Sequence, residues 1–263
     1  MEAEPIYEVE AGRFVPTEHA AGPWDPAYLH GGAVSGLLAR EVEVRGDVAF
    51  DLVRLTVELV RPVPRVPLTV DLEEASASKS VRRLAVTVAT ADGVVATGTA
   101  LLVRHADLDH GATGADDRLE AGADVGEPTR FPHEPADGGG AFHRTGMELR
   151  FVQGGFDQPG PGTTWFRFRR PLVAGDTPTA LQTVAAAADF GNGISWALPA
   201  DRWVFINPDL TIHLARPPAT AWIGMAAVTI ASPVGWGMAE SAIYDEGGRV
   251  GRSVQSLFVD RRR

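Results

Sequence analysis

Two matching segments, 155 residues apart, are the feature that most constrains how this chain can fold. Residues 55–62 read LTVELVRP and residues 210–217 read LTIHLARP, so they share the pattern L-T-[VI]-x-L-[VA]-R-P. At the same offset, Gly93 falls on Gly248. Chance similarity between β-rich segments is the alternative, but separate matches at one offset favour duplication of a unit of roughly 110–120 residues.

A change of composition separates the two halves. Residues 106–140 hold nine acidic and only two basic side chains, together with seven Gly and three Pro. A segment of this kind buries little surface, which is typical of a linker. We therefore predict an N-terminal unit over residues 1–105, an acidic Gly/Pro-rich linker over 106–140 and a C-terminal unit over 141–263.

Each half contains one predicted helix and several predicted strands. In the first half, a helix begins at His30 and runs through Arg40, and the strands follow at 52–60, 67–75, 81–91 and 94–104. In the second half, strands at 146–152 and 163–170 precede the helix, and strands at about 203–215, 221–231, 236–244 and 249–259 follow it.

The second helix has an unusual composition. Thr177 is a suitable N-cap, Pro178 suits the first helical position, and the helix ends at the Gly-Asn-Gly of 191–193. Four consecutive Ala and few polar side chains leave it without a wide solvated face. Such a helix is normally buried, so we expect a curved antiparallel sheet to wrap around it.

Composition excludes several classes of protein. The net charge of the chain is −10, and residues 106–140 carry a net charge of −7 of this total. Without a run of more than three basic residues, nucleic acid and anionic membranes are poor partners. There is no cysteine, which excludes disulfides, thiolate nucleophiles and Cys-type metal sites. The acidic N-terminus does not resemble a secretory signal, and no apolar run would span a bilayer, so we expect a cytoplasmic protein.

Several motifs, in this order and spacing, resemble the acyl-CoA thioesterase II family. They are His30-Gly31-Gly32 at the start of the first helix, Ser78 to Arg83 before a strand, Ala188-Asp189 at the end of the second helix, residues 207–217, and Ser253-Val254-Gln255 in the last strand.

The resemblance implies an α+β fold of two tandem hot-dog units, each a central helix wrapped by an antiparallel sheet. It also implies an enzyme that uses activated water to hydrolyse the thioester of an acyl-CoA to free acid and CoA. The implied small-molecule partner is acyl-CoA, the implied assembly is a homodimer, and neither a metal nor a cofactor is expected, because CoA enters as part of the substrate.

The family's catalytic set, as the resemblance implies, is an Asp, a Thr or Ser, and a Gln that together activate water. The Asp falls on Asp189 and the Gln on Gln255. The hydroxyl position holds Asn207, which departs from the family pattern, although its amide could still bind water or a carbonyl oxygen.

The residues themselves support parts of this set. Asp189 follows four Ala near a helix end, where poor hydration would raise its pKa and suit a general base; an outward-facing Asp is the alternative. Alternation puts Gln255 on the buried face of its strand, where it either orients water or bonds to backbone. Alternation also points Asn207 away from the core, unless a bulge at Pro208 reverses it.

Two further groups are candidates for substrate contacts. Gly31 and Gly32 offer backbone N–H groups at a helix start, which suits an oxyanion hole, and His30 is a substrate-binding or capping residue beside them. The resemblance suggests that a basic cluster, made of Ser78, Lys79, Arg82 and Arg83, lies near the pantetheine or phosphate portion of CoA; a solvated strand entry is the alternative.

Two other functions stay open. A non-catalytic module that binds acyl-CoA is favoured by Asn207 in place of a hydroxyl. A hot-dog enoyl-CoA hydratase or dehydratase is less favoured, because these enzymes usually pair a His with an Asp and the second helix carries no His. The first-half site is expected to be degenerate: the position nine residues after His30, where related enzymes often carry an acid, is Ala39, and Glu41 is the nearest substitute.

Overall fold

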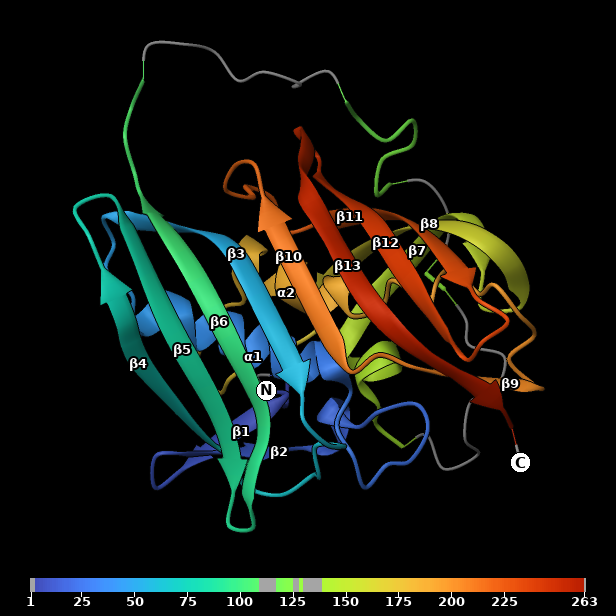
Figure 1. The fold of residues 1–263 in the computed structure, drawn as a ribbon, viewed down its shortest axis with the longest axis horizontal. Coiled ribbons are helices and arrows are strands. Elements are labelled where there is room, and N and C mark those ends of the chain that lie inside the picture. Colours follow the sequence, from blue (N-terminus) through green and yellow to red (C-terminus); the bar gives the residue numbers. More distant parts are fainter. Residues whose placement is uncertain (1–2, 109–116, 125–127, 130–138, 263) are drawn as a thin grey trace.

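A curved eleven-stranded antiparallel sheet lies over two helices in the computed structural model, which describes residues 3–108, 117–124, 128–129 and 139–262 (Figure 1). The helices are α1 (Gly31–Arg45) and α2 (Ala180–Ala188), with one-turn helices at Glu18–Ala20 (η1) and Phe142–Gly146 (η2). The strands of the first half are β1 (Tyr7–Glu10), β2 (Arg13–Pro16), β3 (Phe50–Leu59), β4 (Thr69–Ala77), β5 (Val81–Thr90) and β6 (Gly93–Arg104). Those of the second half are β7 (Met147–Gly155), β8 (Gln158–Phe168), β9 (Trp203–Ile206), β10 (Asp209–Leu214), β11 (Ile223–Ala231), β12 (Trp236–Asp245) and β13 (Gly248–Arg261).

The duplicated motif forms the junction between the two halves. The strand order is β4-β5-β6-β3-β10-β13-β12-β11-β8-β7, with β9 paired to β13, so β3 of the first half is hydrogen-bonded to β10 of the second. In this pair Thr56 lies directly opposite Thr211, its counterpart in the repeat, and their Oγ1 atoms are 3.2 Å apart. On their other sides, Thr56 pairs with Thr99 and Thr211 pairs with Val254. These two partners, Thr99 and Val254, are also 155 residues apart. The register therefore supports the duplication.

Helix α2 is buried, as its composition predicts. Val184 to Ala188 are each 1% exposed or less, and α2 packs against α1 as well as against the sheet. Small side chains allow this approach: a Cβ added to Gly36 of α1 would lie 3.5 Å from the Cβ of Ala186.

The boundaries of both helices differ from the prediction. The N-cap of α2 is Thr179 rather than Thr177, because the Thr179 hydroxyl accepts the N–H of Gln182 at 3.1 Å. Helix α1 continues past Arg40 to Arg45, where an ion pair of 2.6 Å between Glu41 and Arg45 joins its last two turns. The N-terminal hairpin β1–β2 was not predicted.

Parts of the predicted linker contact the second half. The carbonyl of Ala121 accepts the Trp165 indole N–H, and the carbonyl of Ala123 accepts the Arg150 guanidinium, both at 2.9 Å. Much of 106–140 lies outside the described residues, so the division into 1–105, 106–140 and 141–263 stays a prediction. Within the described part of the chain, no helix is both long enough and apolar enough to cross a bilayer.

Candidate active site

The end of α2 meets the start of α1, and this contact brings four of the predicted site residues to one point. Asp189 is the C-cap of α2, His30 is the N-cap of α1, and Gly31 and Gly32 form the first turn of α1. Side chains from the sheet complete the site, because both Asn207 and Gln255 hydrogen-bond to Asp189.

The Asp189 carboxylate is buried and surrounded by donors. Its side chain is 6% exposed. Oδ2 lies 2.9 Å from Nδ1 of His30, and Oδ1 accepts the Asn207 amide at 2.7 Å. The N–H of Gly32 is a third donor. The alternative of an outward-facing Asp189 is therefore wrong.

The expected rise in the pKa of Asp189 is also wrong. Burial does favour the neutral acid, but hydrogen bonds and electrostatic attraction from His30, together with the donors of Asn207 and Gly32, outweigh it. The pKa of Asp189 therefore lies below its ordinary value, because every near neighbour stabilises the anion.

One proton must be assigned at this contact. Nδ1 of His30 lies 3.0 Å from the Gly32 nitrogen as well as 2.9 Å from Asp189. If Nδ1 accepted from Gly32, its lone pair would face an anionic oxygen. We therefore assign a proton to Nδ1, which donates it to Asp189, and the Gly32 N–H then points to the same carboxylate.

The two glycines permit this close approach. A Cβ on Gly31 would lie 2.5 Å from Oδ1 of Asp189, and one on Gly32 would lie 2.5 Å from the carbonyl oxygen of Ala186. Their N–H groups differ in availability. That of Gly32 is directed to Asp189, whereas that of Gly31 has no acceptor among the described residues.

Gln255 supports the backbone around Asp189. The residue is 1% exposed, as alternation predicts. Its Nε2 donates to the Asp189 carbonyl and its Oε1 accepts the Asn192 N–H, both at 3.1 Å. The amide thus bonds to backbone on both sides, and one of its two N–H groups remains for another acceptor.

Asn207 points inward because the predicted strand over 203–215 is interrupted. It lies between β9 and β10, next to Pro208, which cannot donate to a strand neighbour. The break reverses the side-chain direction, as a bulge would. Asn207 is partly buried, and in the described part of the chain its amide oxygen makes no hydrogen bond.

The basic cluster lies at the opposite end of α1. Arg82 pairs with Asp47, just beyond the end of α1, at 2.9 Å and stacks on Phe50, while Ser78 bonds to the backbone of Val81. With 15 residues in α1, this end lies roughly 20 Å from Asp189. The structure does not bring Ser78, Lys79, Arg82 or Arg83 to the carboxylate, and their role in binding the remote part of CoA stays a prediction.

Aromatic rings that were not predicted hold His30 in place. Its ring stacks on Phe190 with the centroids 4.5 Å apart, and it lies 5.1 Å from the Phe142 ring. Phe190 directly follows Asp189, so the segment that ends α2 supplies both the carboxylate and the ring. The direct His30–Asp189 pair was also missed, because nothing in the sequence shows which helix ends meet.

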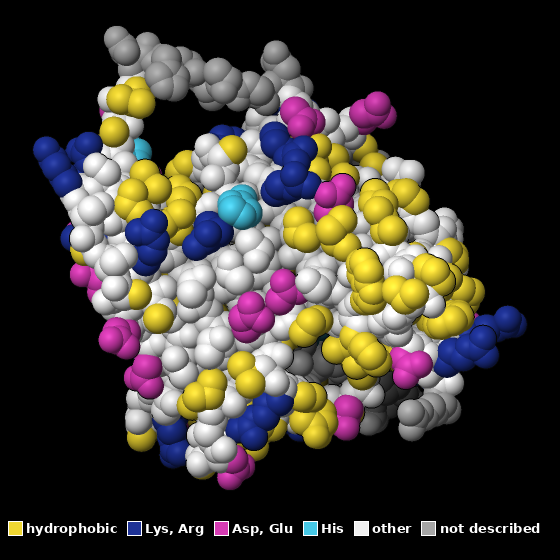
Figure 2. All heavy atoms as spheres, viewed as in Figure 1, with side chains coloured by type: hydrophobic (Ala, Val, Ile, Leu, Met, Phe, Trp, Pro, Cys, Tyr) yellow, Lys and Arg dark blue, Asp and Glu magenta, His cyan; other side chains and the backbone are white. Residues whose placement is uncertain are grey.

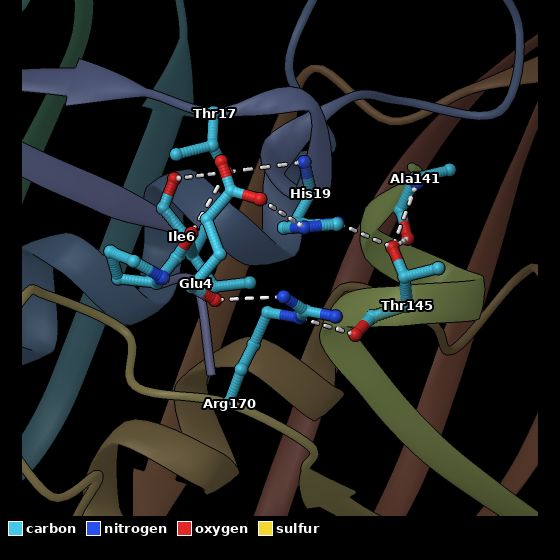
Figure 3. Close-up of polar contacts among 8 residues, drawn as sticks. Glu4, Ile6, Thr17, His19, Ala141, Thr145 and Arg170 are labelled. Carbon is cyan, nitrogen blue, oxygen red and sulfur yellow. Dashed lines mark hydrogen bonds and ion pairs between the residues drawn. The ribbon is translucent and has the colours of Figure 1, made fainter. Parts of the chain in front are cut away.

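A second polar cluster anchors the segments around His30 (Figure 3). His19 lies between Thr145 Oγ1, at 2.9 Å from Nδ1, and Glu4, at 3.2 Å from Nε2. The order hydroxyl, imidazole, carboxylate is that of a hydrolytic triad. However, the Thr145 hydroxyl donates to the Ala141 carbonyl and accepts its N–H, so this cluster closes the turn that carries Phe142.

Two surface cavities, of about 420 and 580 Å³, lie away from this site. The first is lined by residues that include Trp222 and Arg150, the second by residues that include Arg169 and Pro178, and neither includes His30 or Asp189. The chemistry that converges on Asp189 is therefore a better guide to the site than surface shape.

Comparisons with known proteins identify the family of the chain. Residues 20–103 match the N-terminal domain of acyl-CoA thioesterase and residues 122–259 match its C-terminal domain. No curated protein matches the chain.

Two solved structures are similar over nearly the whole chain. A hot-dog protein from Alicyclobacillus acidocaldarius is 15% identical, with a TM-score of 0.70, covering 97% of this chain and 95% of the other. An acyl-CoA thioesterase II from Mycobacterium marinum is 14% identical, with a TM-score of 0.65, covering 97% and 94%. The predicted α+β double hot-dog fold is thus confirmed, and from the domain matches the chain belongs to the acyl-CoA thioesterase family.

Proposed function

We propose that this protein hydrolyses the thioester of an acyl-CoA to free acid and CoA, by activated water, at the contact between α1 and α2. The observation that carries the proposal is the buried Asp189 carboxylate, held as an anion by His30, Asn207 and Gly32 at the start of a helix. A buried, pre-oriented anion beside amide donors is suited to fix a water molecule for attack.

The reaction joins the water oxygen to the carbonyl carbon and then breaks the C–S bond. The negative charge that develops on the carbonyl oxygen needs a donor. We assign this role to the Gly31 N–H, which is free among the described residues and lies at the positive end of α1. Gly32, which the sequence also suggested, has its N–H directed to Asp189.

Asn207 and Gln255 have different tasks in this proposal. The unused amide oxygen of Asn207 is available to accept from the attacking water, which a Thr or Ser hydroxyl would do in the family pattern. Gln255 keeps the Asp189 backbone in place. Hydrolysis consumes only water and the thioester, so the proposal includes no cofactor and no metal. A cytoplasmic location and a role in lipid metabolism accompany it as expectations.

The test is steady-state release of free thiol from a panel of acyl-CoAs of different chain length. Wild type should turn over at least one of them. Asp189→Asn should lose roughly 10³-fold or more in kcat, because a neutral amide replaces the carboxylate that accepts from the surrounding donors and orients the water. The control is Glu43→Gln, which changes a half-buried carboxyl group at the other end of the helix pair. This variant should keep its activity.

Two outcomes would contradict the proposal. An Asp189→Asn variant that folds like wild type and retains full activity would remove the assignment of the site. Tight binding of acyl-CoA by wild type, without turnover of any member of the panel, would instead favour the non-catalytic binding module.

A hot-dog hydratase is a second candidate because of one specific observation. His30 from α1 lies 2.9 Å from Asp189, so a His–Asp pair exists although the second helix carries no His. Adding water to an enoyl-CoA would join the water oxygen to C3 and a proton to C2. Loss of the enoyl absorbance without release of thiol would identify this activity.

The expected homodimer has a candidate surface on the outer face of the second-half sheet. Figure 2 shows hydrophobic side chains gathered over β11–β13. Seven of them, on β9 and β11–β13 and in the β11–β12 turn, are between 36% and 69% exposed: Ile206, Val228, Ile230, Val234, Trp236, Met238 and Phe258. Their exposed parts amount to several hundred Å², on the order of the ~800 Å² per partner in a standard interface.

We assign this surface to a second copy of the chain, since a two-fold interface places the same patch on both sides. Light scattering after gel filtration should give a dimer for wild type and a monomer for Trp236→Glu combined with Phe258→Glu. Val48→Glu, fully exposed elsewhere, should remain dimeric. A monomeric wild type would contradict the assignment.

A further inference from the structure

We propose that Nε2 of His30 accepts the proton of the attacking water, while Asp189 orients the imidazole and stabilises its cation. This deepens the proposed function, on which it rests, because it moves the proton acceptor from the carboxylate to the ring. The sequence placed His30 only as a capping or substrate-binding residue.

The first support is the state of Asp189. Each of its carboxylate oxygens already receives a donor, at 2.9 Å from His30 and 2.7 Å from Asn207, and the Gly32 N–H adds a third. A carboxylate in such an environment is a weak base, since protonating it would break hydrogen bonds that depend on the anion. It is better suited to hold a neighbouring group than to take a proton itself.

The second support is the geometry of His30. Nδ1 is directed to Asp189, so Nε2 is the ring nitrogen left for the substrate, and it has no hydrogen-bond partner in the described part of the chain. The ring is 9% exposed and is clamped by stacking on Phe190 and by Phe142. A rigid imidazole with one nitrogen on a buried carboxylate and the other open is the arrangement of a general base.

The surrounding charges fit this role. Asp189 on α2 faces the ring directly and stabilises its cation. On η2, burial and then the positive charges of His30 and Arg144 lower the pKa of His143 to about 3, so His143 adds no charge near neutral pH. Arg144 lies on the same one-turn helix as His143, and Glu18 and His19 of η1 directly precede Ala20, whose carbonyl accepts the His30 backbone N–H.

The proton balance closes without another reactant. As the water oxygen bonds to the carbonyl carbon, one water proton moves to Nε2 and the ring becomes an imidazolium. When the C–S bond breaks, the electron pair stays on sulfur, and the sulfur takes the proton back from Nε2. CoA leaves as the thiol, the acid is released, and the ring returns to its starting state.

The test compares the pH profiles of two variants at position 30. His30→Asn keeps a good N-cap and an amide that can donate to Asp189, but it has no basic nitrogen. We expect kcat to fall about 10²–10⁴-fold, KM to stay within about twofold, and the acid limb of the kcat/KM profile to disappear. His30→Gly removes the ring with little loss of capping, and added imidazole should restore part of its rate.

The matched control is His213→Asn, at an exposed histidine on β10, which should leave the rate and the profile unchanged. The inference is overturned if His30→Asn keeps the acid limb of wild type or if imidazole does not raise the rate of His30→Gly. In either case wild type still hydrolyses acyl-CoA and the proposed function stands. A wild type that releases thiol from no acyl-CoA fails at the earlier step, and the proposed function falls first.

Discussion

The two ends of the α1–α2 pair each carry a carboxylate near a helix start, yet the groups around these two carboxylates differ. At one end, Asp189 from the end of α2 lies against the start of α1. At the other end, Glu43 in the last turns of α1 lies against the start of α2, where it accepts from the Thr179 hydroxyl and the Gln182 amide at 2.8 Å. Both ends thus place a carboxylate at a helix N-terminus.

The neighbours of the two carboxylates make the difference. Donors outweigh burial at Asp189 and lower its pKa, whereas burial outweighs the donors at Glu43 and raises its pKa. The start of α2 has Ala180 and Leu181 where α1 has two glycines, so a ligand cannot approach its backbone as closely. Glu41, the first-half acid suggested by the sequence, is buried in ion pairs with Arg40 and Arg45.

The sheet shows the same contrast at equivalent positions. Asn207 and Gln255 correspond to Leu52 and Ala100, at the offset of 155 that the strand register supports. Leu52 and Ala100 are apolar and buried. After duplication, one copy of the site therefore carries polar groups around its carboxylate, and the other contributes packing.

Among the variants that test this comparison, the largest effect is expected from filling the space that the first glycine of α1 leaves. Gly31→Ala puts a Cβ about 2.5 Å from Oδ1 of Asp189, so the carboxylate must move. We expect a loss of roughly 10²-fold in kcat/KM, since displacements of about 1 Å cost that much. Gly36→Ala, on the same helix with an ordinary 3.5 Å contact, should keep full activity in the same assay. Equal activity of the two variants would contradict the prediction.

The second prediction concerns a substitution that makes the second half resemble the first at one strand position. Gln255→Ala copies Ala100 and leaves the Asn192 N–H and the Asp189 carbonyl without their partner. Buried groups of this kind cost about 1–3 kcal/mol when unpaired. The free energy of unfolding in urea should fall by that amount, with lower activity. A change below about 0.5 kcal/mol, as at ordinary surface positions, would show that water replaces the amide.

A third prediction concerns Asn207, the amide donor that has no counterpart in the first half of the chain. Asn207→Asp replaces an amide 2.7 Å from Asp189 with a second carboxyl group. Two carboxylates this close cannot both ionise easily, so one pKa should rise. We expect about tenfold lower activity at neutral pH and a pH profile displaced toward alkaline values. Asn207→Leu, which copies Leu52, should lose activity without that displacement.

The smallest effects should appear in the pH dependence of stability. Because the folded pKa of Asp189 is lowered, its stabilisation is present at neutral pH and is lost as the pH falls through that pKa. The folded pKa of Glu43 is raised, so its ionisation destabilises the fold and the penalty disappears in acid. In urea unfolding, Asp189→Asn should be less stable than wild type at pH 7, and Glu43→Gln slightly more stable, by about 0.5 kcal/mol or less. Both differences should shrink toward pH 3; differences of the same sign would break the comparison.

Local patterns in the sequence predicted most of the fold. The repeat predicted two related halves, alternation predicted the strands and the buried side of Gln255, and the Ala-rich segment predicted a buried helix. These succeeded because they depend on side-chain period and composition. The predicted helix ends were less accurate. Thr177 and Thr179 are both threonines and therefore equally good N-caps, and hydrogen bonds with Glu43 and Gln182 favour Thr179.

The sequence predicted most residues of the candidate site but not the contacts between them. Asp189, Asn207, Gln255 and the glycines were named from the resemblance, and they do converge. The donors that lower the pKa of the Asp189 carboxylate were missed. One of them, His30, lies 159 positions from Asp189 along the chain. No local pattern encodes such a pairing, because it depends on how two helix ends meet under a shared sheet.

The sequence by itself determined that this chain is a duplicated α+β protein with a buried Ala-rich helix, since these follow from periodicity and burial along continuous segments. Only the tertiary structure showed how the neighbours of Asp189 hold its carboxylate as an anion. That depends on long-range contacts: a carboxylate from one half, a helix start and a histidine from the other, and the inward turn of Asn207. An identical Asp at the same helix end, without these neighbours, would be an ordinary buried acid with a raised pKa.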